Sequence, residues 1–133
     1  MKVLVVSPHP DDESLGCGGT LLSHKARGDE THWLLMTKMS IVGGFSGDQI
    51  ATRAQEIRQV AAHFGFAGTH ELGFYTTELD RLPLSLLCAQ IGKVIKSVAP
   101  EVIYLPFWGD GHSDHRVTFE AASGCSKWFR YPS

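Results

Sequence analysis

The chain begins with the apolar run Lys2-Val3-Leu4-Val5-Val6-Ser7, and Pro8-His9-Pro10-Asp11-Asp12-Glu13 follows it directly. A short valine-rich run is typical of a strand buried in a parallel sheet. The next six residues place one imidazole and two adjacent carboxylates at the carboxyl end of that strand, where open α/β sheets bind ligands. Polar groups beside a core strand are costly unless they pair or hold a cation. The stretch therefore indicates a metal site.

A second polar cluster follows another apolar run near the end of the chain. Residues 102–106, Val-Ile-Tyr-Leu-Pro, have the composition of a buried strand, and residues 107–115, Phe-Trp-Gly-Asp-Gly-His-Ser-Asp-His, come directly after it. Because the carboxyl ends of parallel strands meet at one edge of a sheet, we expect the two clusters to lie close together.

Apolar runs and amphipathic segments alternate between these clusters. This alternation predicts an α/β fold: a Rossmann-like, doubly wound, mostly parallel sheet of roughly four strands with helices on both faces. Glycines at 28 and 65 are placed to end the first two helices. The expected strands are residues 2–7, 30–37, 70–74 and 102–106, and the expected helices are 14–27, 50–64, 84–98 and 114–129.

Composition excludes several classes of protein. With 133 residues, 43% of them hydrophobic, the chain is expected to be a single domain with its own core. Its 12 basic and 14 acidic residues form no basic block, which argues against nucleic-acid binding. We see neither a signal peptide nor an apolar run long enough to span a membrane, so a cytoplasmic location is expected. Three widely spaced cysteines without a CxxC pair argue against a disulfide framework or a thiolate zinc site.

The two clusters resemble the motifs of the PIG-L/LmbE family of zinc-dependent N-acetylglucosaminyl de-N-acetylases. The family's HPDDE element is similar to residues 9–13 and its HxDH element to residues 112–115, each after a strand and in the right order. The resemblance covers nearly all of the chain. Family members are usually longer, so residues 1–133 are expected to lack the family's usual C-terminal portion.

The resemblance implies a role for each residue of the two motifs. His9, Asp12 and His115 match the metal ligands, which hold Zn²⁺ and could also accept iron(II) or cobalt(II). Asp11 matches the general base that activates the zinc-bound water.

The remaining motif residues are assigned around the reacting amide. His112 is expected to stabilise the oxyanion or protonate the leaving amine, and Asp114 to orient His112. The implied reaction removes an acetyl group from an N-acetylglucosamine-type sugar or sugar conjugate. The small-molecule amino sugar is thus the expected partner.

Three further residues are candidate substrate contacts: Arg53, on a helix where the family carries an arginine, Asp80 in an edge loop, and Trp108 beside the second motif. Arg53 could instead form a surface ion pair with Glu56.

The acidic residues of the motifs also have structural alternatives. Asp114 could cap the last helix, Asp12 or Ser14 could cap the first, and Glu13 could simply favour a helix N-terminus. The glycines at 16, 18 and 19 do not match GxGxxG, and we expect them to allow close approach of the backbone near the metal.

Two other functions remain open. Two histidines and one carboxylate are also the ligand set of non-haem iron oxygenases, although those enzymes usually present it from an antiparallel barrel. A truncated, non-catalytic metal-binding or partner module is the other alternative. The edge of the strand at 102–106 is expected to be uncovered, which favours a homo-oligomer or capping by the aromatic tail at 128–131.

Overall fold

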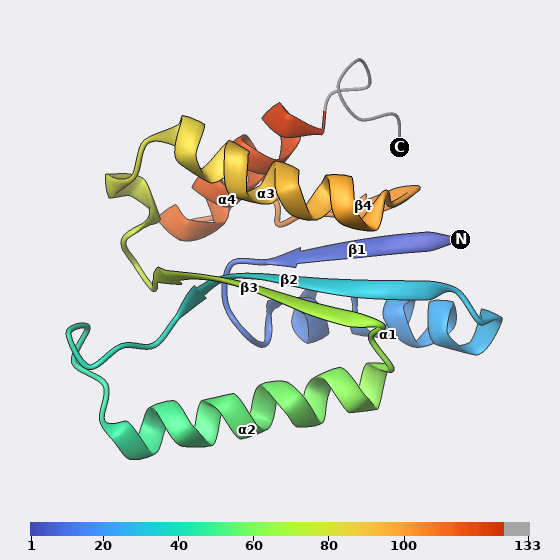
Figure 1. The fold of residues 1–133 in the computed structure, drawn as a ribbon, viewed down its shortest axis with the longest axis horizontal. Helices are drawn as coiled ribbons and strands as arrows, with labels where there is room; N and C mark the ends of the chain where they lie inside the picture. The colour runs from blue at the N-terminus through green and yellow to red at the C-terminus, as the bar shows by residue number, and fades with distance from the viewer. Residues whose placement is uncertain (127–133) are drawn as a thin grey trace.

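Four parallel strands form one sheet in the order β3-β2-β1-β4 (Figure 1). The computed structural model describes residues 1–126 of the chain. The strands are β1 (Lys2–Ser7), β2 (Glu30–Lys38), β3 (Gly68–Tyr75) and β4 (Val102–Tyr104). The predicted parallel α/β sheet is thereby confirmed.

Helices cover both faces of the sheet (Figure 1). On one face lie α1 (Asp12–Arg27) and α2 (Gly47–Phe64), and on the other lie α3 (Leu84–Val98) and α4 (Ser113–Cys125), with the short 3-10 helix η1 (Leu79–Arg81) before α3. Successive side chains of a strand point to opposite faces, so each strand supplies two cores. Leu4 packs in the core beneath α3 and α4, and Val5 in the smaller core with α1 and α2.

The direction in which successive strands are added to the sheet reverses at β1. Strands β2 and β3 follow β1 on one side through α1 and α2, whereas β4 lies on its other side after α3. In such sheets the crevice outside the carboxyl ends of the strands, at the reversal, is where ligands bind. The two motif loops that follow β1 and β4 meet at that crevice.

The loop after β1 is held to β2 by Thr37. The Thr37 hydroxyl donates to the Pro8 carbonyl at 2.8 Å, and the Thr37 amide donates to the same oxygen at 3.2 Å. Thr37 lies where the pairing of β2 with β3 shifts register, and Gly73 across from this shift has φ of 75°. The extra residue of this bulge belongs to β3, so β3 bends at the carboxyl end of the sheet, where the motif lies.

Several element boundaries were predicted correctly and several were wrong. The bounds of β1 and α3 match, and Gly28 and Gly65 end α1 and α2 with φ of 79° and 70°. Helix α1 begins at Asp12 instead of residue 14, β4 ends at Tyr104 instead of residue 106, and α4 ends at Cys125. The predicted end of the last helix at residue 129 and the aromatic tail lie outside the described residues.

The glycines of α1 are not crowded by protein atoms, and their expected role of letting the backbone approach the metal stays a prediction. A Cβ atom at Gly16 or Gly19 would meet nothing within 4 Å, and one at Gly18 would make an ordinary contact of 3.8 Å with the Phe64 ring. The helix has non-helical φ and ψ at Cys17, because several glycines in its first turns leave its backbone weakly restrained. No helix among residues 1–126 is both long and apolar enough to cross a bilayer.

Candidate metal centre

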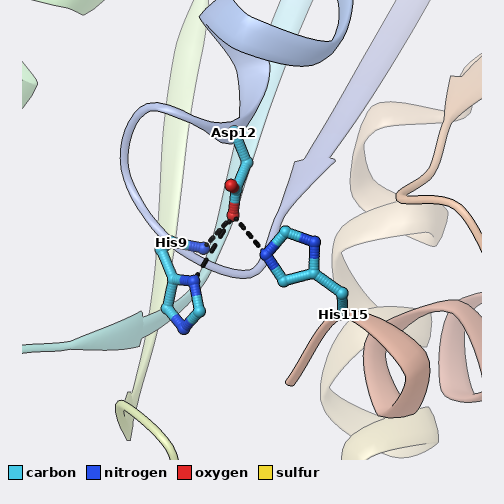
Figure 2. Close-up of side chains that lie close together, drawn as sticks. All are labelled: His9, Asp12 and His115. Carbon is cyan, nitrogen blue, oxygen red and sulfur yellow. Dashed lines mark hydrogen bonds and ion pairs between the residues drawn. The ribbon is translucent and has the colours of Figure 1, made fainter. Parts of the chain in front are cut away.

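His9, Asp12 and His115 come together at the crevice between β1 and β4 (Figure 2). The Oδ2 atom of Asp12 lies 3.2 Å from Nε2 of His115 and 3.5 Å from Nδ1 of His9. The same oxygen accepts the backbone N–H of His9 at 2.8 Å. Three partly exposed donor groups from two distant segments thus converge around one small volume.

The two separations that Asp12 makes with the imidazoles match those of ligands on a tetrahedral ion, and all three donor atoms lie within 4.8 Å of one another. Two bonds of about 2.05 Å that meet at a tetrahedral angle place their ligand atoms about 3.3 Å apart, close to the separations that Asp12 makes with the two imidazoles. Two nitrogens and one carboxylate oxygen are also a common donor set of catalytic zinc sites, which keep a fourth position for water or substrate. The residues therefore fit a divalent transition metal.

Each imidazole of the cluster is held from behind by a second carboxylate. Nε2 of His9 lies 2.7 Å from Oδ2 of Asp114, and Nδ1 of His115 lies 3.2 Å from Oδ2 of Asp110. A carboxylate on one ring nitrogen fixes the proton there and leaves the lone pair on the other nitrogen, which is the usual support of a metal-bound histidine. Nδ1 of His9 and Nε2 of His115 are thereby set to face the ion.

Asp114 is fully buried and joins three segments of the chain. Besides His9, its carboxylate accepts the backbone N–H of Thr77 at 2.7 Å and of Leu79 at 3.3 Å. Burial alone would raise the pKa of Asp114, but these hydrogen bonds, that of His9 foremost, outweigh it and hold the pKa below 3.8. Thr77 has φ of 67°, an unusual value for a β-branched residue, so Asp114 also stabilises a strained turn.

These contacts correct two expectations about Asp114. Its carboxylate bonds to His9 rather than orienting His112, and it is not the cap of α4. The cap is His112, whose Nδ1 accepts the backbone N–H of Asp114 at 3.0 Å. His9, His112 and Asp114 form a second set of clustered donor atoms, yet the oxygens of Asp114 already serve Thr77 and Leu79. The set with Asp12 and His115 is therefore the better metal centre.

Asp11 adopts a left-handed conformation with φ of 95°, which is rare for a residue other than glycine. Its backbone N–H donates to Oε2 of Glu13 at 3.1 Å. The Asp11 side chain is 66% exposed to solvent and is not one of the clustered donor groups. Asp11 precedes α1 without capping it through its side chain, and Asp12 is the first residue of that helix.

Glu13 is a buried support of the motif loop. Only 1% of its surface is exposed, and it accepts hydrogen bonds from Ser14 at 2.9 Å, from Asp11, and from Ser7 at 3.4 Å. Ser7 in turn accepts the indole N–H of Trp33 at 2.9 Å. Burial raises the pKa of Glu13 above 4.5 in spite of these donors. Glu13 thus anchors the strained turn at Asp11 to β1 and β2. A glutamate that only favoured the helix N-terminus would not need to be buried or to make these contacts.

A cavity of about 420 Å³ opens beside the metal centre. His9, His112 and Arg53 line it, and apolar residues of α2 and the loop before it form much of its wall. Nη1 of Arg53 lies 3.5 Å from Asp11 and 3.3 Å from Glu56, so the alternative surface pair is present, while a contact with substrate stays a prediction. The apolar lining residues are Met39, Phe45, Ile50, Ala54 and Ile57.

The other two expected substrate contacts lie outside the lining of this cavity. Asp80 is exposed in η1, because the turn inserts its neighbour Leu79 into the core. Trp108 is 66% exposed and packs on Phe107. A second cavity, of about 650 Å³, reaches Asp12 and His115 from the β4 side and includes Phe107 but not Trp108.

The most informative residue that the sequence analysis assigned no role is Asp110. Its Oδ1 accepts the backbone N–H of His112 at 2.9 Å while its Oδ2 pairs with His115. These contacts, with the hydrogen bond from His112 foremost, hold the pKa of Asp110 below 3.8. The signal available was an aspartate five residues before a candidate ligand in a glycine-rich loop, which is too common a pattern to identify a partner without the fold.

Comparison with known proteins gives a consistent result. The sequence pattern of the PIG-L family, described as GlcNAc-PI de-N-acetylase, matches residues 4–126. The chain is 35% identical over 122 residues to the diacetylchitobiose deacetylase of Thermococcus kodakarensis, a match that covers 86% of this chain and 45% of that protein.

Two solved structures share the fold. The conserved protein TT1542 of Thermus thermophilus is 31% identical with a TM-score of 0.79, over 92% of this chain and 54% of the other. The N,N'-diacetylchitobiose deacetylase of Pyrococcus horikoshii is 27% identical with a TM-score of 0.81, over 99% of this chain and 51% of the other.

The chain thus spans about half the length of these relatives. The match of the family pattern extends from β1 to the end of α4 and includes both loops that build the metal centre. With sequence, fold and the placement of both motifs in agreement, we conclude that this chain belongs to the PIG-L family of GlcNAc-PI de-N-acetylases.

Proposed function

We propose that this protein is a metal-dependent deacetylase that hydrolyses the acetamido group of an N-acetylglucosamine-type sugar or sugar conjugate. One observation carries the proposal: His9, Asp12 and His115 converge at the spacing of a zinc site, and a carboxylate holds each imidazole. The names of the relatives, which include diacetylchitobiose deacetylases, support the same activity and substrate class.

His9, Asp12 and His115 are proposed to hold the ion, with zinc expected and iron(II) or cobalt(II) as alternatives. When bound, zinc supplies Lewis-acid activation of a water molecule and of the amide carbonyl. The two imidazoles and the single carboxylate leave one net positive charge at the centre, which favours this activation.

Asp11 is proposed to act as the general base. Its carboxylate is not part of the donor cluster, and it lies 3.5 Å from Arg53, which lines the cavity beside the metal centre. In this role it takes the proton of the attacking water and passes it to the leaving amine. The buried Glu13, through the N–H of Asp11, keeps that carboxylate in place.

His112 is proposed to bind the carbonyl oxygen. Its Nδ1 accepts the N–H of Asp114, so in this geometry the ring carries its proton on Nε2. His112 lines the cavity beside His9, with the two rings 4.7 Å apart. It can therefore donate a hydrogen bond from Nε2 to the developing oxyanion.

Arg53 is proposed to contact the sugar hydroxyls from the side of the cavity. Its side chain is 26% exposed and is oriented by Glu56, which leaves guanidinium donors available for a ligand. Asp80 and Trp108 remain weaker candidates, because a substrate would have to extend well beyond the cavity to reach them.

The test combines metal content with turnover. We expect about one zinc per chain in the purified protein, and release of free amine and acetate from N-acetylglucosamine or its simple conjugates. Asp11→Asn should abolish the release while the metal stays bound, and Asp48→Asn, at an exposed position in the first turn of α2, should leave both unchanged.

Other outcomes distinguish the alternatives. Bound metal without release from any acetamido sugar would favour a non-catalytic metal-binding module. Bound iron with consumption of oxygen would favour an oxygenase. Absence of tightly bound metal would overturn the assignment of His9, Asp12 and His115.

We also propose that the protein self-associates through the edge of β4. Among the described strands β4 pairs only with β1, and Leu15 and Phe107 near this edge are 85% and 63% exposed. Light scattering after size exclusion should show a dimer or larger assembly, and a monomer at all concentrations would refute this. The cytoplasmic location predicted from the sequence is likewise a proposal, to be tested by cell fractionation.

A further inference from the structure

A second pair of imidazoles lies near the amino ends of β2 and β3, whereas the metal centre lies at the carboxyl ends of the strands. His32 and His70 are each the third residue of their strand, on the neighbouring strands β2 and β3 (Figure 1). Nδ1 of His32 lies 3.2 Å from Nε2 of His70, and the ring centroids are 5.4 Å apart. Nothing in the proposed deacetylation uses these residues.

One of these rings is oriented as a metal-bound histidine would be. Oε1 of Glu30 lies 2.8 Å from Nε2 of His32, and this carboxylate keeps the ring proton on Nε2. Nδ1 of His32 therefore presents its lone pair to His70. Burial, and to a lesser degree the nearby His32, lowers the pKa of His70, so its ring is neutral at physiological pH.

Gly68 lies against both nitrogens. Gly68 faces His32 across the strand pair, and a Cβ atom there would lie 2.9 Å from Nδ1 of His32 and 3.2 Å from Nε2 of His70. Any larger residue would therefore displace the two rings. The absence of a side chain at this position lets the two nitrogens approach to 3.2 Å, a separation that two ligands of one ion can have.

We propose that His32 and His70 form a second transition-metal site, which binds Cu²⁺ or Ni²⁺ more tightly than Zn²⁺. Two metal–nitrogen bonds of about 2.05 Å that span 3.2 Å enclose an angle of about 100°, between square-planar and tetrahedral values. The ion replaces the proton between the rings, which moves to Nδ1 of His70. Water completes the coordination.

Counting bound Cu²⁺ by equilibrium dialysis tests the proposal. We expect the wild-type chain to bind one ion more than either His32→Asn or His70→Asn. His63→Asn is the matched control, because His63 is an exposed histidine of α2 outside the pair, and it should bind as the wild type does. Since the test is a difference between variants, it does not depend on the metal centre at His9.

Two further variants separate a metal site from general disruption. Gly68→Ala keeps both histidines and has no positive φ to strain, yet its methyl group should eliminate the second ion. Glu30→Gln should weaken binding about tenfold by removing the carboxylate behind His32. Equal copper binding by the wild type, His70→Asn and Gly68→Ala would show that the pair is only an imidazole hydrogen bond.

Discussion

Replacing Asp114 by asparagine should weaken both the metal centre and the fold. The carboxylate is fully buried and accepts three hydrogen bonds, from Nε2 of His9 and the backbone amides of Thr77 and Leu79. Asparagine has one acceptor oxygen, so its amide group must face at least one of these donors. The substitution therefore leaves a buried donor unpaired while it removes the charge that the site is built to hold.

The magnitude follows from these contacts. Hydrogen bonds to a charged group contribute about 1.5–3 kcal/mol each, and breaking a buried charged pair costs about 3–5 kcal/mol. Because the asparagine oxygen still serves one amide, we expect Asp114→Asn to lower the free energy of unfolding by about 2–4 kcal/mol. Without its carboxylate partner, His9 should bind metal about 10- to 100-fold more weakly.

Asp110→Asn is the matched control. Asp110 supports His115 as Asp114 supports His9, yet its side chain is 36% exposed. We therefore expect a similar loss of zinc affinity with little change in stability, since water can satisfy the groups that it leaves. Urea unfolding of the metal-free variants measures stability, and competition with a chromogenic chelator measures zinc affinity.

The comparison can refute the reasoning in two ways. Equal stability of the two metal-free variants would show that the buried carboxylate of Asp114 contributes no more to the free energy of unfolding than the exposed carboxylate of Asp110 does. Unchanged zinc affinity in both would show that the two carboxylates do not orient the ligands, and the metal centre would then need a different donor set.

Three other outcomes are expected. The stability gap between wild type and Asp114→Asn should narrow as pH falls below 3.8, because a carboxyl whose pKa is lowered by folding stabilises only while it is ionised; a constant gap in urea titrations would contradict this. Glu13→Gln should show the opposite trend, gaining stability relative to wild type as pH rises above 4.5, because burial raises the pKa of Glu13 and folding then disfavours its charged form; parallel pH profiles would count against it. Arg53→Ala should raise KM about tenfold with stability changed by less than about 1 kcal/mol, and a fall in kcat at constant KM would mean that Arg53 acts on Asp11 instead of the sugar.

Periodic patterns were sufficient for most of the fold. The valine-rich run of β1 and the amphipathic spacing of α3 predicted both elements to the residue, and Gly28 and Gly65 marked two helix ends. The wrongly predicted boundaries lie where the backbone adopts an unusual conformation. Helix α1 begins early because the turn at Asp11, with its positive φ, already directs Asp12 into the helix.

The sequence by itself determined the doubly wound parallel α/β sheet and the edge at which His9, Asp12 and His115 meet, because the alternation of strands and helices and the position of each motif after a strand follow from patterns along the chain. Only the tertiary structure decided which carboxylate supports which imidazole. Asp114 lies two residues from His112 but bonds to His9, 105 residues away, because α4 directs it into the core beside Thr77 and Leu79. Hydrogen-bond partners depend on the direction of each side chain to within an ångström, and sequence spacing does not carry that information.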